Sequence, residues 1–322
     1  MKENQFPLVS AIIPFYNRAD LVSKAIESAL AQDYPNLEII VSDNCSTDHA
    51  DSVVKKYLSD KRIRYSRNET NIGMLPNFRK AAYELAKGGL FSFIASDDKL
   101  IDNRFISESV RLINNHEDIV LVFARNQMIN KQGRIINTCP EHPYFVKEFW
   151  NGRDVFFKAP EYGFLSWGGC MIKKDVLYAV KGLQSDCIFA DMECNYKIML
   201  SGNVGFINRI CYESLSHSDN ASDTRKAEDK ISQLRCLNDI CEYAKNILPA
   251  EAGRIDQWNG HFVYALGYNY LKMLTENNQK EFIRFKEYFI KTYPAKYKSI
   301  KAKWKYMLFM IFYSIKNKIK IN

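Results

Sequence analysis

The sequence VSAIIPFYNRADLVSKAIESALAQDYPNLEIIVSD, residues 9–43, contains two short apolar runs on either side of a segment with helical spacing. The runs at residues 8–13 and 37–41 are continuous and apolar, as expected of strands buried on both faces of a parallel sheet. Between them, Val22, Ile26 and Leu30 recur on one face of a helix. The stretch therefore predicts a strand–helix–strand unit in which the two strands lie parallel.

The same alternation of strand and helix continues to residue 100. We expect helices at 47–58 and 75–86, and strands at 63–65 and 90–95. Farther along, the spacing of apolar residues predicts a helix at 103–114 and a strand at 119–124, followed by a loop-like part at 125–165. Strands are expected at 164–172 and 204–208, with a helix at 191–201 between them. From residue 224 onward the pattern is helical.

These elements indicate an α/β fold with a mostly parallel central sheet, helices on both faces, and a C-terminal helical extension. We expect a first domain at residues 1–222, with a nucleotide-binding half at 1–100 and an acceptor half at 101–222. Residues 223–322 form the second, helical region of this prediction.

The composition excludes several classes of protein. With 47% apolar and 25% charged residues, the chain of 322 residues is composed like a soluble globular protein rather than a disordered one. The eight cysteines show no zinc-ligand spacing, so we expect reduced, mostly buried thiols in a cytosolic protein. The N-terminal residues lack the long apolar stretch of a signal peptide.

The net charge of +8 is concentrated at the C-terminus. Residues 280–322 hold 12 Lys or Arg and 2 Asp or Glu, whereas the rest of the chain holds 33 basic and 35 acidic residues. A nearly neutral body argues against nucleic-acid binding. The apolar, aromatic run at 304–313 is shorter than the ~20 residues of a spanning helix. It indicates a basic tail on an anionic membrane surface, with a helix docked on the core as the alternative.

Polar clusters follow three of the predicted strands, at residues 14–18, 43–48 and 96–98. In an open parallel sheet, ligands bind beyond the carboxyl ends of the strands. Asp43 and Asp48 could instead cap the next helix, and Asp97-Asp98 could be a solvated turn. A divalent ion explains the adjacent carboxylates better, because it removes their repulsion and bridges to phosphate. The chain has no GxGxxG and no GxxxxGK[ST] motif.

The segments VSDNCSTD (41–48), NIGMLPNFRKAAYELAKGG (71–89) and FSFIASDD (91–98), together with the first strand, resemble glycosyltransferase family 2 with the GT-A fold. The resemblance is strong over residues 7–100 and weaker to 222. Within the family, the sequence is similar to bacterial O-antigen and capsule enzymes, including abequosyltransferases. It implies an inverting transfer of a hexose or deoxyhexose, from a nucleotide-diphosphate sugar to a hydroxyl of a glycan or lipid-linked acceptor, with Mg²⁺ or Mn²⁺ as cofactor.

The same resemblance implies roles for single residues. Asp97, Asp98 and His217 correspond to positions near the metal, although Ala95 stands where the family often has another acid. Alternatively, His217 could be an ordinary surface histidine. The positions implied to bind the donor are Pro14, Tyr16, Asn17, Asp43, Asn71, Asn77 and Asp97.

For the catalytic base, the family has an acidic segment at a helix start, with a glycine eleven residues after the Asp. Asp191 precedes Gly202 by eleven residues, so Asp191 is the predicted base, although Ala190 replaces the usual preceding acid. Glu193 is the alternative base, or an ordinary first-turn acid. The predicted acceptor residues, which could equally form a bulged strand with a core tryptophan, are Trp167, Gly168 and Gly169.

Two other classes of protein remain open at this point. A non-catalytic, membrane-associated scaffold with the same fold would explain the missing acids at Ala95 and Ala190. A nucleotidyltransferase on a related sheet would need a basic, glycine-rich loop near the first strand, and the sequence has none.

Overall fold

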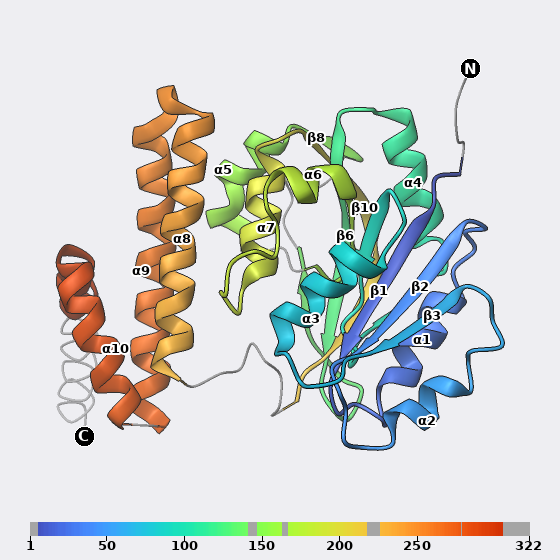
Figure 1. Ribbon diagram of the computed structural model, residues 1–322. Helices are drawn as coiled ribbons and strands as arrows, with labels where there is room; N and C mark the ends of the chain where they lie inside the picture. Colours follow the sequence, from blue (N-terminus) through green and yellow to red (C-terminus); the bar gives the residue numbers. More distant parts are fainter. Residues whose placement is uncertain (1–5, 141–146, 163–166, 218–225, 278, 305–322) are drawn as a thin grey trace, which may run out of the picture. The chain divides into compact units, whose positions relative to one another are not determined.

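A computed structural model describes residues 6–140, 147–162, 167–217, 226–277 and 279–304 (Figure 1). The chain divides into two compact units, Met1–Ser222 and Asp223–Asn322. The first is an α/β unit and the second is helical, so the predicted fold class is confirmed.

The sheet of the first unit begins with four parallel strands. Their order is β3 (Ile63–Arg67), β2 (Leu37–Asp43), β1 (Val9–Phe15) and β4 (Leu90–Phe93). Of these, β1, β2 and β4 are buried along their whole length, as is typical of a parallel sheet. The sheet continues with mixed directions through β9 (Cys170–Lys173), β6 (Ile119–Ile129), β10 (Asn203–Leu215) and β5 (Lys99–Leu100). Two short strands pair beside this path, β7 (Ile135–Cys139) with β6 and β8 (Phe149–Trp150) with β10.

Helices cover the two faces of the sheet according to the alternation of side chains along each strand. Val9, Ala11 and Ile13 of β1 share one core cluster with α1 (Val22–Leu30) and α4 (Phe105–Asn115). The remaining helices of this unit are α2 (Ala50–Lys55), α3 (Met74–Lys80) with the π-helix η1 (Ala81–Leu85), α5 (Gly152–Tyr162), α6 (Lys174–Ala179) and α7 (Ala190–Met199).

The prediction of a loop-like part at 125–165 is wrong. β6 continues to Ile129, β7 and β8 follow, and α5 occupies Gly152–Tyr162. β7 is largely exposed and β8 has two residues, so neither carries the apolar run that marks a buried strand. Likewise, β10 extends to Leu215 instead of ending at residue 208.

Several predicted boundaries also move. The helix expected at 47–58 is only Ala50–Lys55, and the one expected at 75–86 changes from α-helix to π-helix at Ala81. Residues 163–166 of the strand expected at 164–172 lie outside the described residues, and β9 begins at Cys170.

The described part of the second unit is helical and contains α8 (Ala227–Ile247), the short 3-10 turn η3 (Pro249–Glu251), α9 (Ala252–Asn277) and α10 (Gln279–Thr292). Phe285 and Phe289 of α10 are fully buried, and the Phe285 ring lies 5.7 Å from that of Tyr270 on α9. A further helical segment covers residues 294–304. None of the described helices is long and apolar enough to cross a membrane. Most of the predicted tail segment at 304–313 lies outside the described residues.

Candidate functional site

The loops after β1 and β2 are tied to each other at the carboxyl edge of the sheet. Phe15 pairs with Asp43 across the two strands, and the Asn44 N–H donates to the Phe15 carbonyl at 2.9 Å. Asn17, which has a positive φ of 51°, accepts from the Thr47 N–H at 2.8 Å. Two of the three predicted polar clusters therefore form one structure.

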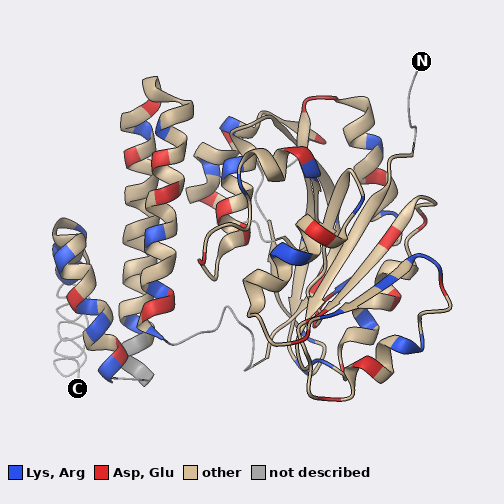
Figure 2. Cartoon of the chain, in the orientation of Figure 1, with Lys and Arg blue, Asp and Glu red and all other residues tan. Residues whose placement is uncertain are grey.

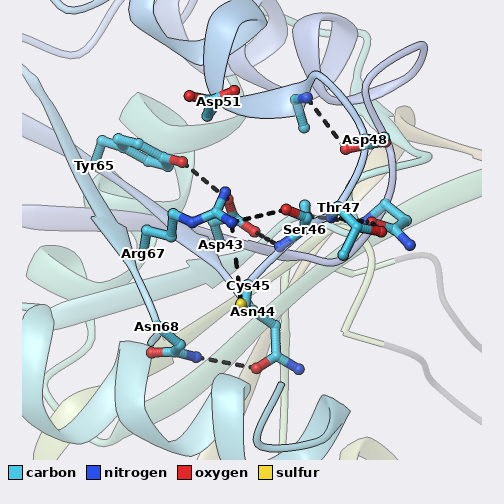
Figure 3. Close-up of polar contacts among 12 residues, drawn as sticks. Asp43, Asn44, Cys45, Ser46, Thr47, Asp48, Asp51, Tyr65, Arg67 and Asn68 are labelled. Atoms are coloured by element: carbon cyan, nitrogen blue, oxygen red, sulfur yellow. Dashed lines mark hydrogen bonds and ion pairs between the residues drawn. The ribbon is translucent and has the colours of Figure 1, made fainter. Parts of the chain in front are cut away.

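Asp43 lies at the centre of this structure and is fully buried (Figure 3). Its Oδ2 accepts hydrogen bonds from the Tyr65 hydroxyl at 2.9 Å and from Arg67 at 3.2 Å. Its Oδ1 accepts from the Ser46 N–H at 2.8 Å. Because these contacts use both carboxylate oxygens, Asp43 fixes the loop after β2 and also holds the Arg67 guanidinium beside it. The Arg67 side chain is 40% exposed.

Asn77 and Asn71 belong to a network of amide side chains beside Asp43. Asn77 is buried and links α3 to β2, since its Oδ1 accepts from the Ser42 hydroxyl and its Nδ2 donates to the Ser42 carbonyl. Asn71 is exposed and accepts from Asn44 at 2.8 Å. Both residues thus shape the loop of the predicted donor site, and Asn71 does so at its surface.

The other predicted donor residues differ in accessibility. Pro14 is buried within β1, whereas Tyr16 is 39% exposed. Asp48 takes the capping role considered above: its carboxylate accepts from the Ala50 N–H at the start of α2 and from the Ala19 N–H.

The acidic turn Ser96-Asp97-Asp98 follows β4 and is held by the end of β10. Asp97 contacts His217 at 2.8 Å between Oδ2 and Nε2. Asp98 accepts from the Tyr212 hydroxyl at 2.9 Å and from the Leu215 N–H at 3.0 Å. The three residues predicted to lie near a metal are therefore neighbours in the structure.

Negative charge accumulates at this turn. Burial, and then the neighbouring Asp97, raise the pKa of Asp98 to about 7. Within the described part of the chain, no three His, Cys, Asp or Glu side chains form a ready metal cluster. The turn instead has the two adjacent carboxylates of an open site, where Mg²⁺ is commonly held by one or two carboxylates together with phosphate oxygens. The residues present fit a divalent cation in this way.

Asp191 lies in the first turn of α7 and is half-buried. Burial raises the pKa of its carboxyl group, although hydrogen bonds from the N–H groups of Met192, Asp191 itself and Trp167 act in the opposite direction. The alternative base, Glu193, forms an ion pair with Lys197 within the same helix. Of these two carboxylates, Asp191 is held by backbone N–H groups, whereas Glu193 is paired with a basic side chain.

The Trp167 ring belongs to the core and does not present an open face for a sugar. Its side chain stacks on Phe93 with ring centres 4.1 Å apart, and its indole N–H donates to Asn195 at 3.1 Å. The residue is 6% exposed. The stacking role is thus corrected in favour of a core tryptophan. Phe93 covers one face of the ring, Asn195 accepts from the indole N–H, and the residue is buried.

Gly168 and Gly169 are required by Tyr212. A Cβ on Gly168 would lie 2.4 Å from the Tyr212 ring, and one on Gly169 would lie 3.2 Å from the Tyr212 Cβ. Gly169 also has a positive φ of 75°. The glycine pair therefore permits close packing of this tyrosine.

Sequence reasoning missed Tyr212, Tyr65 and Arg67, which contact the predicted carboxylates. Tyr65 and Arg67 alternate on β3 and are paired with Val41 and Asp43 of β2, so the register of two parallel strands could have indicated them. Tyr212 carries no such signal, because β10 meets the acidic turn from a distant part of the chain.

A family model described as Glycosyl transferase family 2 matches residues 10–180. A Rickettsia typhi protein named as a glycosyltransferase is 33% identical over 244 residues, which cover 74% of this chain and 72% of that protein. WcaA of Escherichia coli, named for colanic acid biosynthesis, is 34% identical over 49% of this chain and 54% of its own length. Chondroitin synthase of Pasteurella multocida is 25% identical, and this chain spans only 24% of it.

Solved structures share the fold at lower identity. Staphylococcus aureus TarS in complex with UDP-GlcNAc has a TM-score of 0.63 and 20% identity, covering 80% of this chain and 72% of that one. A Pyrobaculum calidifontis mannosyltransferase in complex with GDP-Man and Mn²⁺ has a TM-score of 0.57 and 16% identity, covering 93% and 85% of the two chains.

Proposed function

This chain belongs to glycosyl transferase family 2, and from that premise we propose that it transfers a hexose or deoxyhexose from a nucleotide-diphosphate sugar to a hydroxyl of a glycan or lipid-linked glycan, with inversion. The observation that carries the proposal is a continuous set of contacts from the acidic turn to Asp191. Asp98 accepts a hydrogen bond from the Tyr212 hydroxyl, and the Tyr212 ring packs on Gly168. The backbone N–H of Trp167, the residue before Gly168, donates to Asp191. Carboxylates from two segments far apart in the sequence are thereby joined.

Asp191 is the proposed base. An inverting transfer needs one carboxylate to take the proton of the acceptor hydroxyl as that oxygen attacks the anomeric carbon from the side opposite the leaving group. The raised pKa of Asp191 suits this role, because a carboxylate of higher pKa is a stronger proton acceptor. Gly168 and Gly169 are the proposed acceptor residues, since they directly follow Trp167, whose backbone N–H donates to Asp191.

Asp97, Asp98 and His217 are the proposed ligands of Mg²⁺ or Mn²⁺. A bound cation would supply positive charge to the departing diphosphate. The protein's part is to keep two carboxylates together in a fixed turn, which the contacts with Tyr212 and Leu215 do.

The donor nucleotide is proposed to lie along the loops after β1 and β2. Tyr16 and Asn71 are the exposed members of this group, and their exposure supports a proposed direct contact with the donor. Asn17, Asp43 and Asn77 act by fixing the loop through their hydrogen bonds.

The biological setting we propose is bacterial surface polysaccharide synthesis, as the names of WcaA and TarS indicate for those proteins. The basic residues along α10 and the segment after it, seen in Figure 2, would place the enzyme peripherally on the inner face of the cell membrane, next to a lipid-linked acceptor.

The test is a binding and turnover screen of the full chain. We expect one of the UDP-, GDP-, CDP- or dTDP-linked sugars to raise the melting temperature in the presence of Mn²⁺, since a ligand stabilises the native state by mass action. The same donor should be hydrolysed slowly without acceptor. Absence of both binding and hydrolysis across the whole panel would refute the proposal and favour a non-catalytic scaffold.

A further inference from the structure

Tyr212 of β10, which contacts both Asp98 and Gly168, also bonds the start of the acidic turn. Its hydroxyl donates to Asp98 Oδ2 at 2.9 Å and accepts from the Ala95 N–H at 3.1 Å. One oxygen atom therefore joins both ends of the turn that carries Asp97 and Asp98. The side chain is 2% exposed, so no water competes for these bonds.

The ring of Tyr212 fixes a second segment. It lies so close to Gly168 that even one methyl group there would overlap it, at 2.4 Å from Cε1. The Gly169 carbonyl in turn accepts from the Ala124 N–H of β6 at 2.8 Å, so the glycine pair is anchored to the sheet. The residue before the pair is Trp167, and its backbone N–H donates to Asp191.

We propose that Tyr212 is a positioning residue that sets the Asp98 carboxylate and the spacing between the acidic turn and the segment holding Asp191. The inference rests on the proposed function, since it assigns Tyr212 a part in holding the cation and the base in register. Tyr212 itself does not touch the reacting atoms.

Two substitutions test the two halves of this proposal. Tyr212→Phe keeps the ring on Gly168 and removes only the hydroxyl, which leaves Ala95 N–H and Asp98 Oδ2 without that partner. Gly168→Ala keeps the hydroxyl and displaces the ring. Tyr212→Phe should lower the affinity for Mn²⁺ in the presence of the nucleoside diphosphate by about tenfold, as expected for a lost hydrogen bond to a charged group. Gly168→Ala should lower it as well, because the displaced ring carries its hydroxyl away from Asp98.

Each variant has a matched control at the opposite edge of the sheet. Tyr34→Phe also removes the hydroxyl of a buried tyrosine, which donates to the Pro7 carbonyl at 2.7 Å. Gly89→Ala adds a methyl group where no atom lies within 4 Å. Both controls should bind Mn²⁺ like the unaltered protein, whatever their melting temperatures.

The measurement is the free Mn²⁺ signal in electron paramagnetic resonance, titrated with UDP, GDP, CDP or dTDP, alongside kcat and KM for the active donor. We expect Tyr212→Phe to lower kcat and Mn²⁺ affinity more than its loss of melting temperature relative to Tyr34→Phe explains. If Tyr212→Phe and Tyr34→Phe are alike in Mn²⁺ affinity and kcat, Tyr212 is an ordinary core residue and the inference fails alone. If the unaltered protein binds no Mn²⁺ with any of these nucleotides, both the proposed function and this inference are refuted.

Discussion

At the scale of single residues, the environment of Asp191 distinguishes it from the carboxylate two positions along. Asp191 accepts hydrogen bonds from backbone N–H groups, whereas Glu193 is bound to Lys197. Asp191→Asn should therefore lower kcat by about a hundredfold to ten-thousandfold, the range for a lost general base, and leave nucleotide affinity nearly unchanged. Glu193→Gln is the matched control on the same helix and should retain most of the turnover. Near-normal turnover of Asp191→Asn would remove it from the role of base.

The same carboxyl group makes a pH prediction. Burial raises its pKa above the ordinary value of 3.8, and a base works only when deprotonated. The rate kcat/KM should thus fall as the pH is lowered, with a midpoint above that ordinary value. A pH profile of kcat/KM from about pH 8 down to about pH 4 measures it. A profile flat down to pH 4 would contradict a base of raised pKa.

Asn77 shows how a buried amide controls the shape of the loop beyond β2. It makes three hydrogen bonds, two with Ser42 and one with Asn68. Asn77→Ala removes these buried hydrogen bonds and leaves the Ser42 hydroxyl without this acceptor, so we expect a loss of about 2 to 3 kcal/mol in unfolding free energy and weaker donor binding. Urea unfolding and nucleotide titration measure the two effects. Asn36→Ala, which removes one exposed hydrogen bond to Phe6, is the control and should change neither by more than about 0.5 kcal/mol.

At the scale of elements, Glu38 anchors the amino end of β2 to the turn before β4. It accepts from the Ser10 hydroxyl at 2.6 Å and from the Lys87 and Gly88 N–H groups, and Arg64 lies 2.9 Å away. Burial alone would raise the pKa of Glu38, but these hydrogen bonds lower it below 4.5. A lowered pKa in the folded state contributes stability above the unfolded pKa, and that stability is lost as the pH falls through the folded value.

Glu38→Gln should therefore cost about 2 kcal/mol near pH 7 and cost less as the pH falls below the ordinary glutamate value, where the unaltered protein loses the same contribution. Urea unfolding at neutral and acidic pH gives the two curves. Glu148→Gln, at a side chain 67% exposed and paired with Arg111, provides the comparison and should be nearly neutral at both. A constant difference between the Glu38→Gln and unaltered curves at all pH values would argue against this ionic anchor.

The elements also show what the sequence could and could not predict. The parallel strands β1, β2 and β4 were predictable because each is a short, mainly apolar run followed by a polar turn. β10 was predicted too short, since register shifts at Ile207 and Ile210 interrupt its alternation before it reaches Tyr212. The carboxylates of the candidate site were therefore predictable, whereas the tyrosine that holds one of them depended on a pairing that only the folded chain shows.

At the scale of the whole molecule, charge and fold are divided between two units. The α/β unit carries the candidate site, and the helical unit carries the excess of basic residues. In α10 and the segment after it, Lys291, Lys298 and Lys301 are exposed, and Ile283 and Ile290 are exposed large apolar residues on α10. Basic side chains next to exposed apolar ones are typical of a surface that meets anionic lipid.

The full chain should consequently float with vesicles that contain anionic phosphatidylserine and remain in solution with purely zwitterionic vesicles. A truncation after Tyr293 should lose this binding, and replacement of Lys291, Lys298 and Lys301 by Gln should weaken it by about tenfold or more, because each lysine near an anionic surface contributes on the order of 1 kcal/mol. The matched control replaces Lys24, Lys61 and Lys131, which are exposed lysines of the α/β unit, and should leave flotation unchanged. Binding should also fall as salt is raised, since screening shortens the reach of the charges. Equal flotation of the full and truncated chains would remove the membrane from the proposal, while the transferase assignment would stand on its own test.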